Sequence, residues 1–304
     1  MTEQPRQANP NDACASAYLR QGTRQIRAIL FDKDGTLVDF QRTWGPAVDE
    51  VIRRLAAGNR AVYEQLSAAS RFIGSERRFL PDSPIIGEPT NLFGARWAEV
   101  LGCSPSAAFF AEINRLLCDA TVMHLAAIGS PKTVLNELAR RRYRIGMCTN
   151  DPELTARAHA CKLGLDGILE FIAGYDSGFG IKPQAGPVLA FAHAVGVPSA
   201  DILVVGDTVF DLDAAHAAGA VAVGVLTGLA TAETLAPHAD ALIASYAELP
   251  DWLEGYRPPS VQPSTRVATT MLWSDSPAGS KTDMSTARAV DEQKKSIGGP
   301  GSRM

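Results

Sequence analysis

The sequence has few cysteines and no long apolar run. Its five cysteines, among 304 residues, are widely spread and form no Cys-x-x-Cys pair, which fits neither a disulfide framework nor a zinc site. No stretch reaches the roughly 18 consecutive apolar residues that a membrane helix needs. The first residues are polar and lack the apolar segment of a secretory signal. We therefore expect a cytoplasmic protein without a membrane partner.

The sequence also lacks an excess of charge of either sign. Lysine and arginine number 29 and aspartate and glutamate 33, so the formal net charge is −4. Proteins that bind nucleic acid by neutralising phosphates are usually basic, and we therefore expect no nucleic-acid partner. A small anionic ligand remains compatible, because a few local cations suffice to bind it. The sequence makes no prediction of the oligomeric state.

The two ends of the chain differ in composition from its middle. Residues 1–25 are polar without periodicity, and we expect a flexible leader there. Residues 258–304 are rich in proline, serine, threonine, glycine and lysine. Such a segment buries too little apolar surface to offset the entropy lost on ordering. It is predicted to be a disordered tail.

Between the ends, short apolar runs alternate with helical patterns. This alternation is typical of repeated βα units and a parallel sheet, and continuous apolar runs are typical of strands buried on both faces. We therefore predict a doubly wound, Rossmann-like α/β core. The predicted strands lie within Ile26–Phe31, Arg144–Cys148, Ile168–Ala173, Ile202–Val205, Val221–Val225 and Ala241–Ile243.

Local signals also predict where core helices begin and end. A helix is expected to start at Ser130-Pro131 and another at Asp151-Pro152, with the first residue of each pair as the N-cap and proline at the first helical position. Gly164 and Gly219 are placed to end helices.

One interval breaks the alternation. Residues 41–125 carry helical patterns and no strand signal, which indicates a helical domain inserted into the α/β core. The core is then made of residues 26–40 and 126–257. The helical patterns in the insert lie within Val48–Ala57, Ala61–Phe72, Phe93–Leu101 and Ser106–Cys118.

Polar residues with a common chemistry follow the predicted strands. In an open parallel sheet, ligands bind beyond the carboxyl ends of the strands. In chain order, the residues found there are Asp32 and Asp34 after the first strand, Thr149 and Asn150 after the second, Lys182 beyond the third, and Asp207 and Asp211 after the fourth. We predict that these side chains meet at one edge of the sheet.

The residue types predict a site for a metal ion and a phosphoryl group. Crowded carboxylates repel one another unless a cation compensates them, and oxygen ligands with room for water and phosphate favour Mg²⁺. Lys182, with the pair Thr149 and Asn150, is suited to bind the phosphoryl oxygens. A helix that begins near Asp151 could add backbone N–H groups to this anion site.

The two aspartates of the first loop are suited to catalysis. Asp32 can attack phosphorus and form an aspartyl phosphate. Asp34 can protonate the leaving oxygen and then deprotonate water, because a neighbouring carboxylate is expected to hold its proton more tightly. Lys182 and the metal ion would compensate the charge of the transferring group.

Each of these signals has a plainer interpretation when it is taken alone. The Asp-x-Asp-Gly sequence can be a solvated turn, and Asp207 and Asp211 can be acids at a helix start. A calcium loop is excluded, because Leu37 and Thr43 stand where an EF-hand needs glycine and glutamate. Four signals in order, each at the end of a strand, favour a common site.

Four segments resemble the motifs of a known family, the haloacid dehalogenase-like (HAD) hydrolase superfamily. FDKDGTLV (31–38) resembles its first motif. The segments that resemble its second, third and fourth motifs follow in the same order: CTND (148–151), Lys182-Pro183 and GDTVFD (206–211). The helical insert resembles a cap of the C1 type, which closes over the site and selects the substrate.

The resemblance implies a role for each site residue. Asp32 would be the nucleophile and Asp34 the acid and base, and Thr149 and Lys182 would bind phosphate. Mg²⁺ would be held by Asp32, the backbone carbonyl of Asp34 and Asp207, with Asp211 in or near its ligand shell.

Within the superfamily, Asp34 and the lack of membrane helices favour a phosphatase. The TLVD sequence at 36–39 resembles phosphoglycolate phosphatases, although Phe40 replaces the usual small residue that follows. The resemblance implies a small phosphorylated metabolite, similar to 2-phosphoglycolate, as the substrate. The alternatives are a phosphomutase that acts on a sugar phosphate and a non-catalytic phospho-acceptor module.

Some cap residues could contact a substrate, but a plainer role is expected for each. The arginines would lie on solvated helix faces, although any of them could meet a substrate carboxylate. Trp44 is expected to pack at the hinge. The arginines are Arg42, Arg71, Arg77, Arg78 and Arg96.

Overall fold

The computed structural model describes residues 25–256. The predicted tail, and the predicted leader apart from Gln25, lie outside the described residues. Within the described part of the chain, no helix combines the length and the hydropathy needed to span a membrane.

The core is a parallel sheet of six strands in the order β5-β4-β1-β6-β7-β8. All six predicted strands are present, so the predicted fold class is confirmed; the first and third begin later than predicted. The strands are β1 (Ala28–Phe31), β4 (Arg144–Cys148), β5 (Phe171–Ala173), β6 (Ile202–Gly206), β7 (Val221–Val225) and β8 (Ala241–Ile243).

Strand β1 lies at the centre of the sheet. The chain leaves it for β4 on one side and later returns to β6 on the other, with Phe31 between Met147 and Val205. The strand order therefore reverses at β1, and such a switch point opens a crevice beyond the carboxyl ends of the strands. The loops after β1, β4 and β6 border that crevice.

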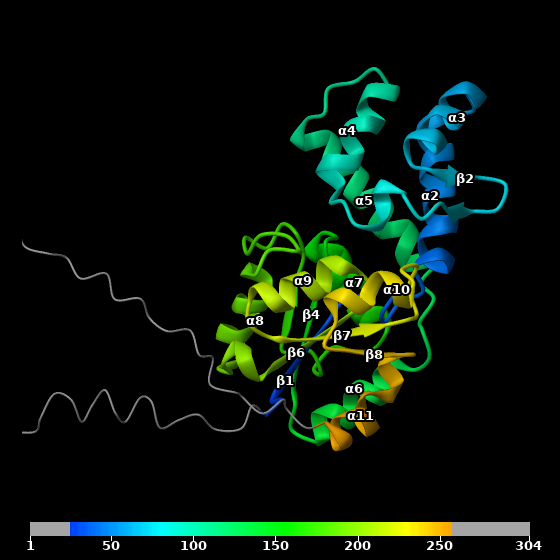
Figure 1. Ribbon diagram of the computed structural model, residues 1–304. Coiled ribbons are helices and arrows are strands. Elements are labelled where there is room, and N and C mark those ends of the chain that lie inside the picture. Colours follow the sequence, from blue (N-terminus) through cyan, green and yellow to red (C-terminus); the bar gives the residue numbers. More distant parts are fainter. Residues whose placement is uncertain (1–24, 257–304) are drawn as a thin grey trace, which may run out of the picture. The chain divides into compact units, whose positions relative to one another are not determined.

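Two hydrophobic clusters hold helices to the two faces of the sheet. Alternate residues of β1 point to opposite faces: Ile29 and Phe31 belong to one cluster and Ala28 and Leu30 to the other. Figure 1 shows α6 and α11 on the side of the sheet opposite α8 and α9. The first cluster includes α6 (Pro131–Arg140), α7 (Glu153–Lys162) and α11 (Leu249–Gly255); the second includes α8 (Gly186–Val195), α9 (Val209–Ala217) and α10 (Ala232–Leu235).

The starts of the core helices agree only in part with the predictions. Ser130 is the N-cap of α6 with Pro131 following, as predicted, although its side chain makes no capping bond. The predicted start at Asp151 is wrong, because α7 begins at Glu153 with Pro152 as its N-cap. The Asp151 carboxylate instead contacts a buried lysine that is described below.

The ends of two core helices are confirmed. Gly164 follows the last turn of α7 with φ +67°, and Gly219 follows that of α9 with φ +74°. Glycine adopts this left-handed backbone conformation without the steric cost that a side chain brings.

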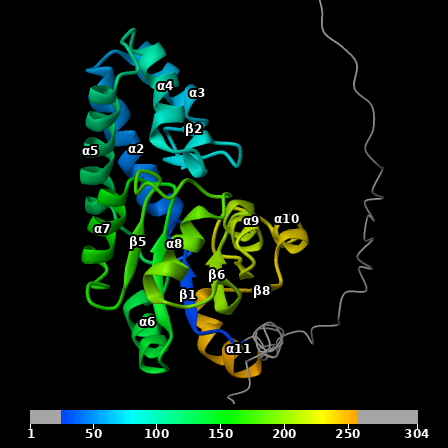
Figure 2. The same ribbon diagram turned by 90° about the vertical axis from the view of Figure 1, so that its left-hand side faces the viewer.

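The inserted segment forms helices with a hydrophobic cluster of their own, which includes Ile52, Leu66 and Trp97. Figure 2 shows α2 and α5 running side by side. Asp39 caps α2 by accepting the N–H of Arg42 at 3.0 Å, so this helix begins earlier than predicted. The helices are α2 (Phe40–Ala56), α3 (Arg60–Ala69), α4 (Thr90–Val100) and α5 (Ala107–Met123). The predicted domain boundaries stay a prediction.

The expectation that residues 41–125 contain no strand is wrong. Strands β2 (Phe72–Ile73) and β3 (Arg78–Phe79) pair in an antiparallel hairpin. Two residues are too few to show the alternation by which a strand is recognised in a sequence.

Candidate active site

Three predicted carboxylates meet beyond the carboxyl ends of β1 and β6. Asp32 follows β1, Asp207 follows β6, and Asp211 lies in the first turn of α9. One oxygen from each lies within 4.8 Å of the other two, and all three side chains are buried. This arrangement can hold a metal ion, because hard cations take carboxylate oxygens as ligands.

The Lys182 ammonium lies among these carboxylates. It donates to Asp32 Oδ1, to Asp211 Oδ1 at 2.5 Å and to the Cys148 carbonyl at 3.1 Å. Burial favours the neutral amine, but the charges of Asp211 and Asp32 outweigh it and hold the pKa of Lys182 well above its usual value. The side chain is therefore a fixed positive charge next to Asp32.

One ammonium does not compensate three carboxylates. Burial, together with the charges of Asp211 and Asp34, raises the pKa of Asp32 to about 7 even though Lys182 lowers it. Burial and the charges of Asp32 and Asp211 raise the pKa of Asp207 well above its usual value. A cation bound among these oxygens would remove the repulsion.

Asp207 is closely surrounded by the backbone. Thr36 Oγ1 donates to its Oδ1 at 3.2 Å. A Cβ added at Gly35, where φ is +83°, would lie 2.1 Å from Asp207 Oδ2, and one at Gly228 would lie 1.8 Å from the same atom. Glycine is therefore required at both positions. Neither Thr36 nor Gly228 was predicted, although Thr36 belongs to the first motif.

Thr149 and Asn150 lie next to Lys182, as predicted. Thr149 is buried, and its Oγ1 accepts the N–H of Asp151 at 3.1 Å. The Asn150 side chain accepts the Lys182 N–H at 3.0 Å and donates to the carbonyls of Lys182 and Gly87, each at 3.2 Å. Asn150 therefore holds the Lys182 loop to the cap; phosphate binding by Asn150 stays a prediction.

The helix end near this site is already capped. The N–H of Glu153, the first residue of α7, donates to Asp176 Oδ1 at 2.8 Å. This N–H group is therefore not available to the predicted anion site.

Asp34 is held on both oxygens. Trp44 Nε1 donates to Oδ1 at 2.8 Å, and Lys33 Nζ donates to Oδ2. Burial would raise the pKa of Asp34, but the charge of Lys33 and the smaller effect of His159 lower it overall. The expectation that Asp34 holds its proton more tightly is wrong for this reason. Trp44 does more than pack, since it also donates this bond.

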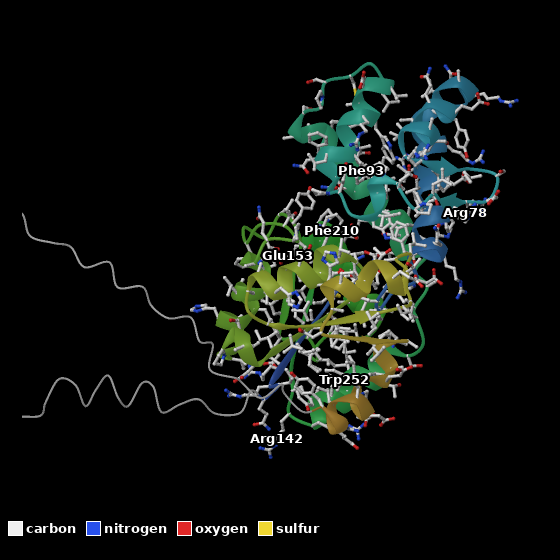
Figure 3. All side chains as sticks on the ribbon, in the orientation of Figure 1. Arg78, Phe93, Arg142, Glu153, Phe210 and Trp252 are labelled. Atoms are coloured by element: carbon white, nitrogen blue, oxygen red, sulfur yellow. The ribbon has the colours of Figure 1, made fainter. Side chains whose placement is uncertain are left out.

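Asp32, Asp34, Thr149, Asn150 and Lys182 line one cavity of about 30 Å³. The cap closes this cavity with an apolar wall and one carboxylate, and the core adds an aromatic ring that lies at the start of α9 (Figure 3). The cap wall begins at Phe40, the first residue of α2 and one residue before the predicted insert. The residues of the whole wall are Phe40, Ile85, Ile86, Gly87 and Glu88 from the segment that runs from α2 to α5, and Phe210 from the core.

None of the five cap arginines is among the described residues that line this cavity. Figure 3 shows Arg78 at the outer edge of the cap. Four of them pair with cap carboxylates: Arg71 with Asp82 at 2.7 Å, Arg77 with Asp49 at 3.3 Å, Arg78 with Glu76 at 3.0 Å and Arg96 with Glu88 at 2.6 Å.

Three buried carboxylates with a lysine ammonium among them thus lie at the switch point of a parallel α/β sheet. The model of the haloacid dehalogenase-like hydrolase family matches residues 26–219. The chain belongs to this family, and the resemblance seen in its four motifs is confirmed.

Individual relatives agree with this assignment. The chain is 28% identical over 252 residues to a phosphoglycolate phosphatase of Rhodospirillum rubrum. This match covers 83% of this chain and 99% of the relative. A predicted phosphoglycolate phosphatase of Haemophilus somnus has a similar structure, with a TM-score of 0.57 and 21% identity over 76% of this chain and 99% of that one. CbbY of Rhodobacter sphaeroides, in complex with phosphate, has a TM-score of 0.54 and 22% identity over 74% and 96%.

The packing around Asp207 predicts different effects for two glycine substitutions. Gly35 and Gly58 have nearly the same φ, +83° and +85°, but a Cβ at Gly58 would meet nothing within 4 Å. Gly35→Ala and Gly58→Ala should both lose about 1 kcal/mol or more of stability through backbone strain. Only Gly35→Ala should also lose turnover of a phosphate ester, by about 100-fold or more, because it displaces Asp207. Thermal unfolding and phosphate release measure the two effects, and full turnover in Gly35→Ala would contradict this packing argument.

Proposed function

We propose that this protein is a Mg²⁺-dependent phosphatase that hydrolyses a small phosphomonoester through an aspartyl phosphate on Asp32. The observation that carries the proposal is the group of three buried carboxylates with Lys182 beside a narrow cavity. The name phosphoglycolate phosphatase, which relatives carry, supports the same reaction class.

The donor set fits a magnesium ion. The carboxylates of Asp32, Asp207 and Asp211, together with the backbone carbonyl of Asp34, would hold it. These are hard oxygen donors, and the carboxylates carry more negative charge than Lys182 balances. A bound Mg²⁺ supplies charge compensation for the transferring phosphoryl group.

The side chains divide the reaction between them. Asp32 attacks phosphorus and the ester O–P bond breaks, while Asp34 gives a proton to the leaving oxygen. Because Lys33 favours the carboxylate form of Asp34, Asp34 must first take up this proton from solvent or from the substrate. In the second step Asp34 takes a proton from water, which attacks the aspartyl phosphate and releases phosphate.

Lys182 and Thr149 would bind the phosphoryl oxygens. Asn150 would do so through its backbone N–H, because its side-chain amide already donates to the carbonyls of Gly87 and Lys182.

The lining of the cavity favours a phosphatase over a phosphomutase. A mutase that transfers a phosphoryl group through Asp32 must hold a bisphosphate intermediate, and the second phosphate needs a cation. Among the described residues, those that the cap contributes to the cavity are Phe40, Ile85, Ile86, Gly87 and Glu88, none of which is cationic. A non-catalytic phospho-acceptor module would need neither a cap wall that encloses a substrate nor Asp34 as an acid and base.

The same wall bears on the choice of substrate. Phe40, Ile85 and Ile86 favour a compact leaving group, and 2-phosphoglycolate is the first candidate because relatives bear its name. The Glu88 carboxylate, which is paired with Arg96, would face the carboxylate of 2-phosphoglycolate, so an uncharged ester of similar size is the natural comparison. The cytoplasmic location and the absence of nucleic-acid and membrane partners stay predictions.

Replacing the nucleophile tests the reaction. Asp32→Asn should lower kcat for a phosphate ester by about 10³-fold or more, because the amide cannot attack phosphorus. Asp213→Asn is the matched control, since Asp213 pairs with His238 on the outer side of α9 and should keep its activity. Phosphate release by purified Asp32→Asn at the wild-type rate would refute the proposal.

Magnesium should stabilise the protein in a pH-dependent way. Because the pKa of Asp32 is raised to about 7 in the folded protein, the stability linked to its protonation is complete below about pH 4 and is lost as the pH rises to about 7. Mg²⁺ at a fixed concentration, about 100 times its Kd at about pH 8, should raise Tm by about 5–10 °C at that pH, and the gain should be smaller at about pH 5.5. Asp207→Asn should lose the gain and Asp213→Asn should keep it; an equal gain in all three proteins would contradict the site.

A substrate panel separates the candidate reactions. We expect stoichiometric phosphate release, dependent on Mg²⁺, from at least one small phosphomonoester in a set that contains 2-phosphoglycolate, an uncharged ester of similar size and sugar phosphates. A sugar phosphate isomer with little free phosphate would instead indicate a mutase. Phosphorylated Asp32 that persists for minutes would indicate a phospho-acceptor module.

A further inference from the structure

Lys33 is a buried charge that the proposed reaction does not use. It stands between the two aspartates of the first motif, and its side chain is fully buried. An ammonium of this kind costs several kcal/mol unless it is well paired. Its partners therefore indicate what it contributes to the site.

Three partners surround the ammonium of Lys33. They are Asp34 Oδ2, Asp151 Oδ2 at 2.8 Å and His159 Nδ1 at 3.2 Å. Asp34 and His159 accept hydrogen bonds from Nζ, whereas Asp151 Oδ2 is an ion-pair partner without a hydrogen bond among the described residues. The position of Nζ is therefore determined by groups from the loops after β1 and β4 and from helix α7.

The bonds of His159 define which of its nitrogens accepts from Lys33. His159 Nε2 lies 2.9 Å from Thr121 Oγ1, and the Thr121 hydroxyl donates to the Leu117 carbonyl at 2.7 Å. Because the hydroxyl proton is used there, Thr121 accepts the Nε2 proton, and Nδ1 is free to accept from Lys33. Burial and the charge of Lys33 lower the pKa of His159 to about 3, which agrees with a neutral ring.

We propose that Lys33, oriented by His159 and Thr121, is a positioning residue that fixes the Asp34 carboxylate for proton transfer to the leaving group. The inference rests on the proposed phosphatase reaction. Asp34 lines the cavity, while Lys33 holds its Oδ2 and Trp44 its Oδ1. A carboxylate held by two donors from different elements cannot rotate away from the reacting oxygen, which lowers the entropy lost on reaching the transition state.

The dependence of activity on the leaving group distinguishes a role in positioning Asp34 from a purely structural role, which would affect all esters equally. An alkyl phosphate needs a proton on its leaving oxygen, whereas 4-nitrophenyl phosphate releases a stable anion. A misplaced Asp34 should therefore impair the alkyl ester much more than the nitrophenyl ester. The ratio kcat/KM is the relevant quantity, because it includes steps only through release of the first product.

The main experiment compares two substitutions of His159 that leave the Lys33 charge in place. His159→Leu removes the acceptor of the ammonium and should lower kcat/KM for an alkyl phosphate by about tenfold or more, and for 4-nitrophenyl phosphate by less than about threefold. His159→Gln keeps an acceptor and a donor and should restore most of the activity. Asp34→Asn should show the same dependence on the leaving group, with larger losses.

Two further variants complete the test. Thr121→Val is nearly isosteric and should show the His159→Leu pattern more weakly, which covers the case that His159→Leu fails to fold. Lys162→Met, at the exposed end of α7, is the control for Lys33→Met, which should show the pattern strongly. Equal losses on both substrates, or no loss, would overturn the positioning role while leaving the phosphatase intact. Wild-type protein inactive on every ester of the substrate panel would overturn the phosphatase and this role with it.

Discussion

The candidate site depends on an excess of buried negative charge. Asp32, Asp207 and Asp211 share a space less than 5 Å across, and Lys182 contacts two of them. Two like charges at about 4 Å repel by about 4 kcal/mol at an effective dielectric constant of 20, more than the roughly 1 kcal/mol that a hydrogen bond such as that from Thr36 returns. Because of this imbalance, the group is suited to hold a cation and is not a set of mutually stabilising ion pairs.

The sheet produces this crowding through its topology. Because β1 is central and its neighbours β4 and β6 come from later in the chain, three loops end side by side at the switch point. Two glycines then allow the backbone to approach Asp207 more closely than any other residue would. The loops after the parallel strands hold Asp32 and Asp207, and the segment that runs from α2 to α5 supplies most of the apolar wall. The site is therefore divided between a rigid frame and a separate covering segment.

A second group of charged residues lies beside the first and differs from it in the ratio of positive to negative charges. Around Lys33 one ammonium faces the carboxylates of Asp34 and Asp151 and a neutral imidazole. Helices of the insert contact this group as well, since Trp44 lies on α2 and Thr121 on α5. The conformation of Asp34 is thus coupled to α2, the helix that also places Phe40 in the wall of the cavity. Asp32 has no such link through hydrogen bonds to the insert among its described partners.

Local sequence signals, apolar runs and the polar residues that follow them, were enough to predict the six parallel strands and the helical insert. The same signals predicted that Asp32, Asp207, Asp211 and Lys182 come together. The surroundings of Asp34 could not be predicted in this way, because they depend on contacts between distant parts of the chain. His159 is 126 residues from Lys33, and whether a lysine between two aspartates points to solvent or inward depends on which acceptors the fold brings to it. That difference reversed the expected direction of the Asp34 pKa. The β2–β3 hairpin was missed for a related reason, since its two-residue strands are defined by pairing and not by pattern.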